Sequence, residues 1–580
     1  MFLHRRATIV GLSALTLFSH HAQASVFTDI LNAFKSSRDC NSCHGILIPA
    51  LQAASNTDTD FVGNLTALCT VAKLADNDVC IGDFALAGPI LAHSLRGMSS
   101  NGTTATKLCS AVFGLCQPPP VTPFTVPLPP PTFDSHAQPV PLYGIHQPFK
   151  VVHMSDVHVD RSYSAGADAN CTKPICCRHF ADEANPPREP AGAFGESRCD
   201  SPIDLAQSML GAIRQVAGDA RFAVLTGDVV AHDTWLANRS EVTVDLDSWN
   251  DEMLGGLPFK IYPALGNHDT SPVNSFPKTG THSNITSQWV YDLEETGWQP
   301  WIGRAAGEQE DHTSGSYAIV VPETNLRVIS INTMFWYRQN LWLYDTDTPI
   351  PDPNGILAFL AHQLQVAEGA GQRAWVIGHI PPGVSDFDHD SSNYYNQIVQ
   401  RYKGTIAGQF FGHTHKDEFQ IAYSDFSNRN AATADSIVWI APSLTPTDGN
   451  PAFRVYDIDP DTFDVVDSKT YIALILGRDS YGPLISDGGL KPTDPLDAPF
   501  WHAVTEAFVA NDTAFQLYNA RKSRVNIGDV PACTGACKNQ TICQNQAARS
   551  QDNCVSRLSF LVSHSHFRFP LHLPPSRESI

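Results

Sequence analysis

Five short motifs in the middle of the chain carry side chains that can bind metal ions. Their carboxylates, imidazoles and amide oxygen can hold two divalent cations about 3.5–4 Å apart, which would clamp an in-line displacement at phosphorus. Two close cations repel each other and need a shared carboxylate, for which Asp228 is suited. The nitrogen-rich set favours zinc over magnesium or calcium. The motifs are Asp156-Val157-His158, Gly227-Asp228, Gly266-Asn267-His268-Asp269, Gly378-His379 and Gly412-His413-Thr414-His415.

Each motif alone has an ordinary structural explanation, since a Gly-Asp pair is usually a turn and a histidine after a strand is usually a hydrogen-bonded structural group. Their joint occurrence is more informative, because the motifs follow short apolar runs. A glycine before the ligand lets the backbone turn sharply at the end of such a run. The runs include Val151-Val152-His153-Met154, Phe222-Ala223-Val224-Leu225, Ile261-Tyr262-Pro263-Ala264-Leu265 and Trp375-Val376-Ile377.

These runs predict buried strands that alternate with helices. Helical periodicity is present, for instance, over Ile203 to Val216 and Leu357 to Ala370. The pattern indicates an α/β domain over residues 149–460, in which functional groups collect in the loops beyond the strand ends. We expect a helical C-terminal region with disulfides over residues 461–560. Residues 561–580 show no readable pattern and stay unassigned.

A small module precedes this domain. Apolar residues at helical spacing over residues 36–117, such as Phe61, Leu65 and Leu68, predict about four short amphipathic helices. Eleven prolines lie between Gln117 and Phe149. Because proline fixes φ and removes a backbone donor, residues 118–148 are predicted to form a semi-rigid spacer between the two domains.

The N-terminus and the cysteines indicate an exported protein. Residues 1–24 have the pattern of a signal peptide, with a basic start, an apolar stretch from Ala7 to Phe18 and the cleavage motif Ala22-Gln23-Ala24. The fourteen cysteines fall into three groups of even number, as expected when each domain closes its own bridges in an oxidising compartment. A zinc site at Cys40 and Cys43 is disfavoured, because no second close Cys or His pair follows.

Seven Asn-x-Ser/Thr triplets add weaker support for export, since such triplets also occur by chance. They lie at Asn64, Asn101, Asn170, Asn238, Asn284, Asn511 and Asn539.

The overall composition limits the possible partners. With 580 residues, 42% of them hydrophobic, the chain can bury at least one large core. It has 38 Lys and Arg against 59 Asp and Glu, a formal charge of −21. This charge disfavours nucleic acid as a partner, and affinity for phosphate must then come from a local source such as bound metal.

The five motifs resemble the five blocks of the calcineurin-like metallophosphoesterases. The resemblance implies a β-sandwich flanked by helices that carries two metal ions. Purple acid phosphatases share this scaffold but need a tyrosine three residues after the bridging aspartate. That position is Ala231 here, so a zinc pair fits better than an iron centre. The resemblance implies one ion on Asp156, His158, Asp228 and His415, and the other on Asp228, Asn267, His379 and His413.

Nearly the whole mature chain resembles the acid sphingomyelinase family, and the last twenty residues depart from it. The resemblance rests on the residues around the motifs, such as Phe410 to Phe419, and on a saposin-like order of six cysteines before a proline spacer. It implies hydrolysis of sphingomyelin to ceramide and phosphocholine with two Zn²⁺ ions, and His268 and His232 as acids that protonate the leaving group. A bridge common in the family's catalytic domain has no cysteines here. The implied disulfides are Cys40–Cys116, Cys43–Cys109, Cys69–Cys80, Cys171–Cys176, Cys177–Cys199, Cys533–Cys537 and Cys543–Cys554.

The resemblance also implies a monomer that contacts membranes peripherally through the saposin-like domain, in a secreted or lysosomal setting. The rings of Tyr394 and Tyr395 could face the choline cation, or they could pack in the core. Two alternatives remain open. One is a related phosphodiesterase acting on soluble nucleotides, and the other is a lipid-binding protein whose phosphoesterase domain is inactive.

Overall fold

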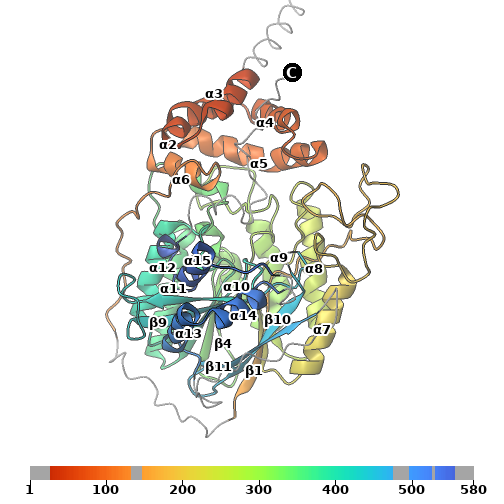
Figure 1. Cartoon of the computed structure of the whole chain (residues 1–580). Coiled ribbons are helices and arrows are strands. Elements are labelled where there is room, and N and C mark those ends of the chain that lie inside the picture. Colours follow the sequence, from red (N-terminus) through yellow and green to blue (C-terminus); the bar gives the residue numbers. More distant parts are fainter. Residues whose placement is uncertain (1–25, 132–146, 448, 474–494, 525–529, 555–580) are drawn as a thin grey trace, which may run out of the picture.

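The computed structural model describes residues 26–131, 147–447, 449–473, 495–524 and 530–554. A layer of helices from the N-terminal part of the chain lies on a larger body that contains both β-sheets (Figure 1). The signal-peptide prediction for residues 1–24 and the unassigned residues 561–580 lie outside the described residues.

The N-terminal module is all-helical. Three bridges tie it together: Cys40–Cys116, Cys43–Cys109 and Cys69–Cys80. Residues 26–35, which precede the predicted start of the module, are also helical, and Ile30 and Phe34 belong to its core. Its elements are α2 (Cys40–Ser42), η1 (Cys43–Leu47), α3 (Ile48–Ala54), α4 (Asp58–Ala72), α5 (Asn77–Gly97) and α6 (Thr103–Ala111).

Helix α5 is the central element of the module. Within the described part of the chain it alone is long and apolar enough to cross a membrane by length and composition. More than half of its apolar window is buried, and Phe84, Leu91 and Leu95 lie in the core of the module. In this structure α5 is therefore a core helix.

The larger body contains two mixed sheets. The first has the order β11-β10-β1-β2-β3, with β1, β2 and β3 parallel. The second has the order β4-β5-β6-β7-β9-β8, with β5, β6, β7 and β9 parallel. The strands are β1 (Phe149–Met154), β2 (Phe222–Leu225), β3 (Lys260–Pro263), β4 (Tyr317–Val320), β5 (Leu326–Ser330), β6 (Arg373–Ile377), β7 (Ile406–Phe411), β8 (Glu418–Tyr423), β9 (Ala434–Ile440), β10 (Ala452–Ile458) and β11 (Val465–Ile472).

Aromatic side chains join the two sheets face to face. Phe222 of β2 meets Trp375 of β6 with ring centroids 5.5 Å apart, and Tyr456 of β10 meets Phe410 of β7 at 5.4 Å. All four side chains are buried in one continuous core. Offset and edge contacts of this kind stabilise a core beyond the area that they bury. The expected β-sandwich is thus confirmed.

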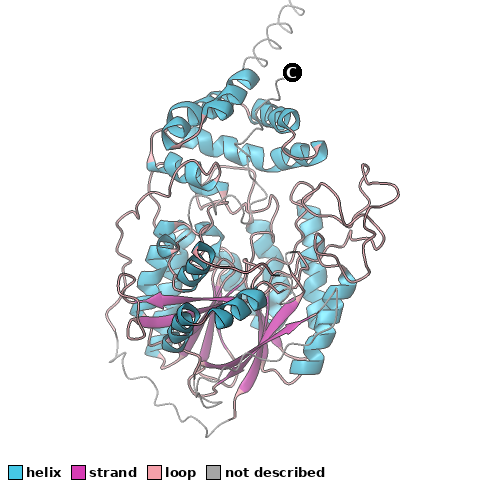
Figure 2. Ribbon diagram, in the orientation of Figure 1, coloured by secondary structure: helices cyan, strands magenta, loops and turns pink. Residues whose placement is uncertain are grey.

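Helices cover the outer faces of the sandwich (Figure 2). Helix α7 packs on β1, α9 on β3, α11 on β5 and β6, and α13 on β8 and β9. The helices are α7 (Ile203–Ala217), α8 (Arg239–Gly256), α9 (Gln288–Ile302), α10 (Arg304–His312), α11 (Ile356–Gly369), α12 (His389–Arg401), α13 (Ala498–Ala510), α14 (Asp512–Lys522) and α15 (Ala536–Asn545), with short turns η2 (Thr333–Trp336), η3 (Leu341–Tyr344), η4 (Pro353–Gly355) and η5 (Ser550–Asp552).

The C-terminal region differs from the expectation of helix over residues 461–560. Residues Val465–Ile472 form strand β11, which pairs antiparallel with β10 at the edge of the first sheet. Most of its side chains are only half-buried, so the apolar alternation of a strand is weak there. Helices begin at Ala498, and the bridges Cys533–Cys537 and Cys543–Cys554 close the end of the described chain.

The proline-rich segment is not a free spacer where the structure describes it. Val126 is buried in the core of the larger body, and its backbone N–H donates to Gln397 of α12 at 3.0 Å. The backbone N–H of Thr122 donates to Asp390 at 2.7 Å. The backbone carbonyl of Thr122 accepts from the hydroxyl of Tyr394 at 2.6 Å. Residues 132–146 of the predicted spacer lie outside the described residues.

Tyr394 and Tyr395 are therefore core residues. Each is 2% exposed, and the hydroxyl of Tyr395 donates to Gln409 at 2.6 Å. The idea that they face a choline group is wrong for this conformation, because α12 turns both rings into the interior.

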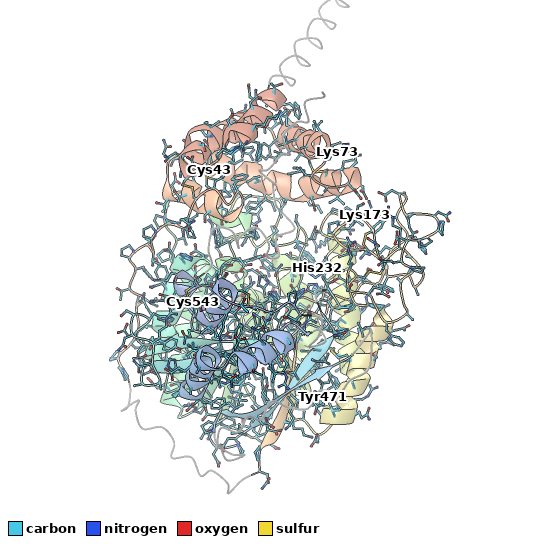
Figure 3. All side chains as sticks on the ribbon, in the orientation of Figure 1. Cys43, Lys73, Lys173, His232, Tyr471 and Cys543 are labelled. Carbon is cyan, nitrogen blue, oxygen red and sulfur yellow. A yellow bond between two sulfur atoms is a disulfide. The ribbon has the colours of Figure 1, made fainter. Side chains whose placement is uncertain are left out.

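Charged side chains fasten the helical module to the larger body. Lys107 of α6 lies 2.9 Å from Asp388 and 2.8 Å from Asp390. At the other end, Lys173, which is labelled in Figure 3, lies 3.3 Å from Asp76 and 2.8 Å from Asp78 of the module. Lys173 itself is 5% exposed. The two parts of the chain thus share a polar, partly buried interface.

Candidate metal centre

The five motifs meet because each follows a strand whose carboxyl end points to one region. Asp156 follows β1, Asp228 follows β2 and Asn267 follows β3, and these three strands are parallel. His379 follows β6, and His413 and His415 follow β7, which is parallel to β6. Since parallel strands end at one edge of a sheet, the loops of both sheets converge.

One group of side chains gathers around His158 and His415. The Nε2 atoms of these two imidazoles are 3.2 Å apart. Asp156 Oδ1 lies 3.4 Å from Nε2 of His415 and 4.0 Å from that of His158. Asp228 Oδ2 lies 3.6 Å from His158 Nε2. Ligand atoms this close, on buried side chains, are a candidate site that could hold one cation.

A second group gathers around His379 and His413. Asn267 Oδ1 lies 2.9 Å from His379 Nε2 and 3.1 Å from His413 Nδ1. The two imidazole nitrogens are 3.3 Å apart. Asp228 Oδ2 is 3.1 Å from His379 Nε2, so one carboxylate oxygen faces both groups. This arrangement supports a dimetal centre in which Asp228 is shared.

The backbone of the ligand loops is held in an uncommon conformation. Left-handed φ angles occur at non-glycine ligands, which costs energy and is typical of functional loops. Gly412 is needed for close approach, because a Cβ there would lie 1.8 Å from Ser155 Oγ and 2.5 Å from Asp156 Oδ2. The residues with positive φ are Asp156 (51°), His158 (43°), Asp228 (57°), His413 (69°) and His415 (59°).

Hydrogen bonds on the outer side of the imidazoles set which nitrogen is available. His158 Nδ1 lies 2.7 Å from the carbonyl of Val230, and His379 Nδ1 lies 2.6 Å from that of Thr226. A carbonyl only accepts, so both rings carry their proton on Nδ1 and present Nε2 to the centre. These bonds orient the rings as outer partners of metal ligands do.

Asp386 plays the same part for His413. Its Oδ2 lies 3.3 Å from Nε2 of that ring, which leaves Nδ1 for the centre. No motif marks Asp386, because it lies seven residues beyond His379 in a loop without a repeated pattern.

Asp269 holds two of the ligand loops together. Its carboxylate accepts from the backbone N–H groups of Gly266 (2.7 Å), Asp228 (3.0 Å) and Val229 (2.7 Å). The fourth residue of the Gly266 motif is therefore a loop-fixing residue. Burial would raise the pKa of the shared Asp228, but the neighbouring His379 holds that pKa well below its usual range.

His232 and His268 lie beside the first group of ligands. The ring of His232 stacks on His158 with centroids 3.8 Å apart, and the rings of His232 and His268 are 4.6 Å apart. His232 also comes within ligand distance of His158 and His415. The backbone N–H of His268 donates to Asp228 Oδ1 at 2.8 Å. His232, which is labelled in Figure 3, is 6% exposed.

Asp200 orients the ring of His232 and raises its pKa. One carboxylate oxygen lies 2.8 Å from His232 Nδ1, and the other accepts from the backbone N–H of His232 at 2.6 Å. Burial alone would lower the pKa of His232, but the charge of Asp200 raises it above 6.5. For His268 burial outweighs the charges of Asp228 and Asp200, and it lowers the pKa of that ring to about 3. Environments that shift the pKa values of two neighbouring titratable groups in opposite directions are typical of acid–base pairs.

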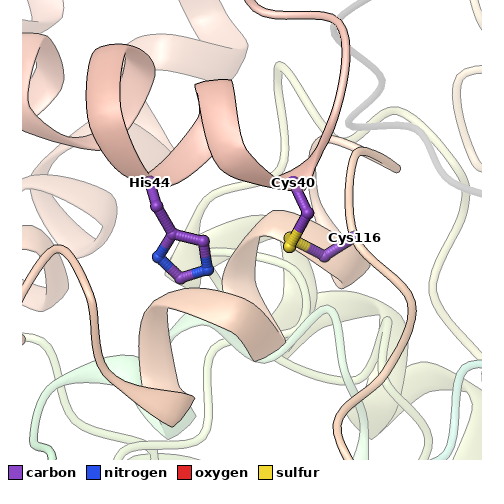
Figure 4. A group of neighbouring side chains, drawn as sticks. All are labelled: Cys40, His44 and Cys116. Atoms are coloured by element: carbon purple, nitrogen blue, oxygen red, sulfur yellow. A yellow bond between two sulfur atoms is a disulfide. The ribbon is translucent and has the colours of Figure 1, made fainter.

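Two other groups of potential ligands are explained by structural contacts. Cys40 and Cys116 form a disulfide beside His44, so their sulfurs are not free to bind metal (Figure 4). His44 is itself held by hydrogen bonds, with Nδ1 2.5 Å from the carbonyl of Ser100. The second group, Asp76, Asp78 and Asp182, surrounds the ammonium of Lys173.

The structure forms all seven disulfides that the family resemblance implies, and no cysteine is free. Among the predicted glycosylation positions, Asn64 is 8% exposed and its amide donates to the carbonyl of Asp60. A buried amide cannot accept a glycan without local unfolding. The other six positions, Asn101, Asn170, Asn238, Asn284, Asn511 and Asn539, are exposed or half-exposed.

Comparisons with known proteins agree with this geometry. Residues 149–417 match the model of the calcineurin-like phosphoesterase family. A sphingomyelin phosphodiesterase of Bos taurus is 34% identical over 435 residues, which are 70% of this chain and 65% of the bovine protein. Sphingomyelin phosphodiesterase 2 of Caenorhabditis elegans is 31% identical, covering 73% of this chain and 72% of the relative. A cyclic GMP-AMP phosphodiesterase of Mus musculus is 26% identical, with 70% and 91% covered.

Proposed function

The chain belongs to the sphingomyelin phosphodiesterase family, and we propose that it hydrolyses the phosphodiester of sphingomyelin to ceramide and phosphocholine. The match spans less than two thirds of the bovine relative's length. The observation that carries the proposal is the pair of ligand groups joined by Asp228, with two histidines beside one of them. Every ligand position of the family's motifs is filled, which argues against an inactive lipid-binding protein.

We propose two Zn²⁺ ions as the metals. Four imidazoles would contribute nitrogen ligands, a donor set that suits zinc. Hydrogen bonds to the outer nitrogens of His158, His379 and His413 fix the orientation of these three rings. One ion would be held by Asp156, His158, Asp228 and His415, and the other by Asp228, Asn267, His379 and His413. Zinc ions at such a site supply Lewis acidity toward the phosphoryl oxygens and activate water for attack.

The leaving alkoxide needs a proton, and we propose that the pair of His232 and His268 supplies it, with His232, whose pKa is raised, as the ring that carries the proton. Both rings lie next to the His158 side of the centre. Asp200 accepts the proton on Nδ1 of His232 and, through its charge, stabilises the doubly protonated ring. Nε2 can then hold the second proton for transfer. Proton transfer by a positioned histidine contributes about 10²–10⁴ in rate.

The helical module is proposed to act as a saposin-like domain at the membrane surface. Three large apolar side chains of its described residues are exposed, with 64% of Val71, 50% of Ile81 and 42% of Ile46 accessible. Exposed apolar side chains on amphipathic helices can enter the lipid interface. We propose a monomer in a secreted or lysosomal setting, where the seven disulfides are stable.

A comparison of two substrates tests the proposal. The purified protein with its metals should hydrolyse sphingomyelin in vesicles, measured as released phosphocholine. A soluble nucleotide diester is the matched second substrate, because the murine relative is named for that chemistry. Hydrolysis of the nucleotide alone would favour the second function. Hydrolysis of neither substrate, with both ions bound, would contradict both enzymatic readings.

A further inference from the structure

A continuous chain of buried hydrogen bonds leads to the metal-ligand candidate Asp156. It begins at Arg454, whose Nη1 lies 3.1 Å from the hydroxyl oxygen of Tyr456. That hydroxyl lies 3.1 Å from Nδ1 of His153, and Nε2 of His153 lies 3.0 Å from Thr226 Oγ1. The remaining two links are Thr226 Oγ1 to Ser155 Oγ at 2.7 Å and Ser155 Oγ to Asp156 Oδ2 at 2.5 Å.

The strand register explains why these side chains meet. His153 pairs with Arg454 across β1 and β10, and β2 lies on the other side of β1. Residues two apart in a strand share a face, so Arg454 and Tyr456 lie on the same face of β10. The chain therefore crosses the first sheet from β10 over β1 to the end of β2. All five contributing side chains are at most 4% exposed.

The residues at the two ends of this series of hydrogen bonds determine which atom donates in each bond. A guanidinium only donates and an ionised carboxylate only accepts. Arg454 must therefore donate to Tyr456, which then has its proton for His153 Nδ1. His153 donates from Nε2 to Thr226, Thr226 donates to Ser155, and Ser155 donates to Asp156. Burial and the charge of Arg454 hold the pKa of His153 well below its usual range, so the ring is neutral and has one donor and one acceptor.

Arg454, at the end of the hydrogen-bond series away from Asp156, also contacts the loop that carries His413 and His415. Arg454 Nη2 also binds Asp417, which lies two residues after His415. A second oxygen of Asp417 accepts from Thr470 of β11 at 2.5 Å. Arg454 thus links the loop that carries His413 and His415 to the hydrogen bonds that end on Asp156.

We infer that His153 is a positioning residue of the metal centre, which fixes the carboxylate of Asp156 through Thr226 and Ser155. Oδ2 of Asp156 takes the hydrogen bond from Ser155, while Oδ1 faces His415 and His158. The backbone N–H of His413 also donates to Oδ1 at 3.1 Å and to Oδ2 at 2.9 Å. With the carboxylate held in this orientation, Oδ1 would be available to an ion of that group without a further loss of side-chain freedom. The inference rests on the metal centre of the proposed function.

Zinc affinity of the metal-free full chain, measured by competition with a chromophoric chelator, tests this role. His153→Phe fills the same space but cannot pass on the hydrogen bond, so we expect one of two zinc equivalents to bind 10- to 100-fold more weakly, as for other outer partners of metal ligands. His153→Gln, whose amide can accept from Tyr456 and donate to Thr226, should restore part of the loss.

The control is Val152→Ala, which removes buried side-chain volume from the same strand but none of the side chains in the series of hydrogen bonds. Equal weakening in that variant, or unchanged affinity for both ions in His153→Phe, would overturn the inference. If His153→Phe does not fold, Ser155→Ala removes only the last hydroxyl and should give the same loss at one ion. Because the readout is metal affinity, a protein that binds zinc as expected but leaves sphingomyelin intact contradicts the proposed function alone.

Discussion

Two buried carboxyl groups should make the stability of this protein fall as the pH rises. Glu294 of α9 is 2% exposed and Glu310 of α10 is fully buried. Glu294 accepts one hydrogen bond from the amide of Asn250 at 2.7 Å, and both carboxyl oxygens of Glu310 lack a hydrogen-bond partner among the described residues. Burial raises the pKa of Glu294 to about 8 and that of Glu310 well above its usual value.

The size of the effect follows from the pKa of Glu294 in the two states. In the unfolded chain this group loses its proton near pH 4.5, whereas in the folded protein it keeps it to about pH 8. Between these pH values the free energy of unfolding falls by about 1.4 kcal/mol for each unit by which the pH rises. The stability is therefore fully present below pH 4.5, and about 5 kcal/mol of it is lost by pH 8. Glu310 acts in the same direction.

Urea unfolding at pH 5, 6.5 and 8, followed by tryptophan fluorescence, measures this loss. Glu294→Gln keeps the shape of the side chain and removes its titration, so the variant should gain stability relative to the wild type as the pH rises. Glu308→Gln is the control, because Glu308 is an exposed residue of α10, the helix that packs against α9. A constant difference between wild type and Glu294→Gln from pH 5 to 8 would refute the reasoning.

Four further variants test the metal centre. Asp228→Ala should lose both metal ions in elemental analysis, because one carboxylate serves both groups. His268→Ala should lower turnover of sphingomyelin about 10²–10⁴-fold with unchanged metal content, and less for a nitrophenyl ester, which needs little protonation. Asp200→Asn should lower turnover most at the alkaline end of the pH profile, since the pKa of His232 then falls. Asp386→Asn should weaken zinc binding about 10–100-fold in chelator competition.

The positions of the ligands could be predicted from the sequence because each stands within a few residues of a strand end. Parallel pairing of β1, β2 and β3 then brings Asp156, Asp228 and Asn267 to one edge without any further information. The same holds for β6 and β7 in the second sheet. Local patterns marked these residues as ligand candidates, since the chemistry lies where the pattern changes from apolar to polar, and the family resemblance divided them between two ions.

The residues that orient the ligands could not be predicted in this way. His153 and its partner Tyr456 are 303 residues apart in the chain, and Asp200 is 32 residues from His232. Within its own run, His153 looks like an ordinary strand residue between Val152 and Met154. Only the register between β1 and β10 brings it to Tyr456, and no periodicity of a single segment specifies which strands pair.

The proline-rich segment shows how composition can predict conformation but not location. Its prolines predict an extended backbone without regular hydrogen bonds, and residues 118–131 have no helix or strand. An extended segment leaves its N–H and C=O groups free for side chains, and Gln397 and Asp390 of the larger body bind them. Deleting the spacer would therefore expose buried apolar surface around Val126 as well as release the helical module. Substitution of exposed apolar residues such as Val71 and Ile81 leaves those contacts intact, and so separates membrane contact from folding.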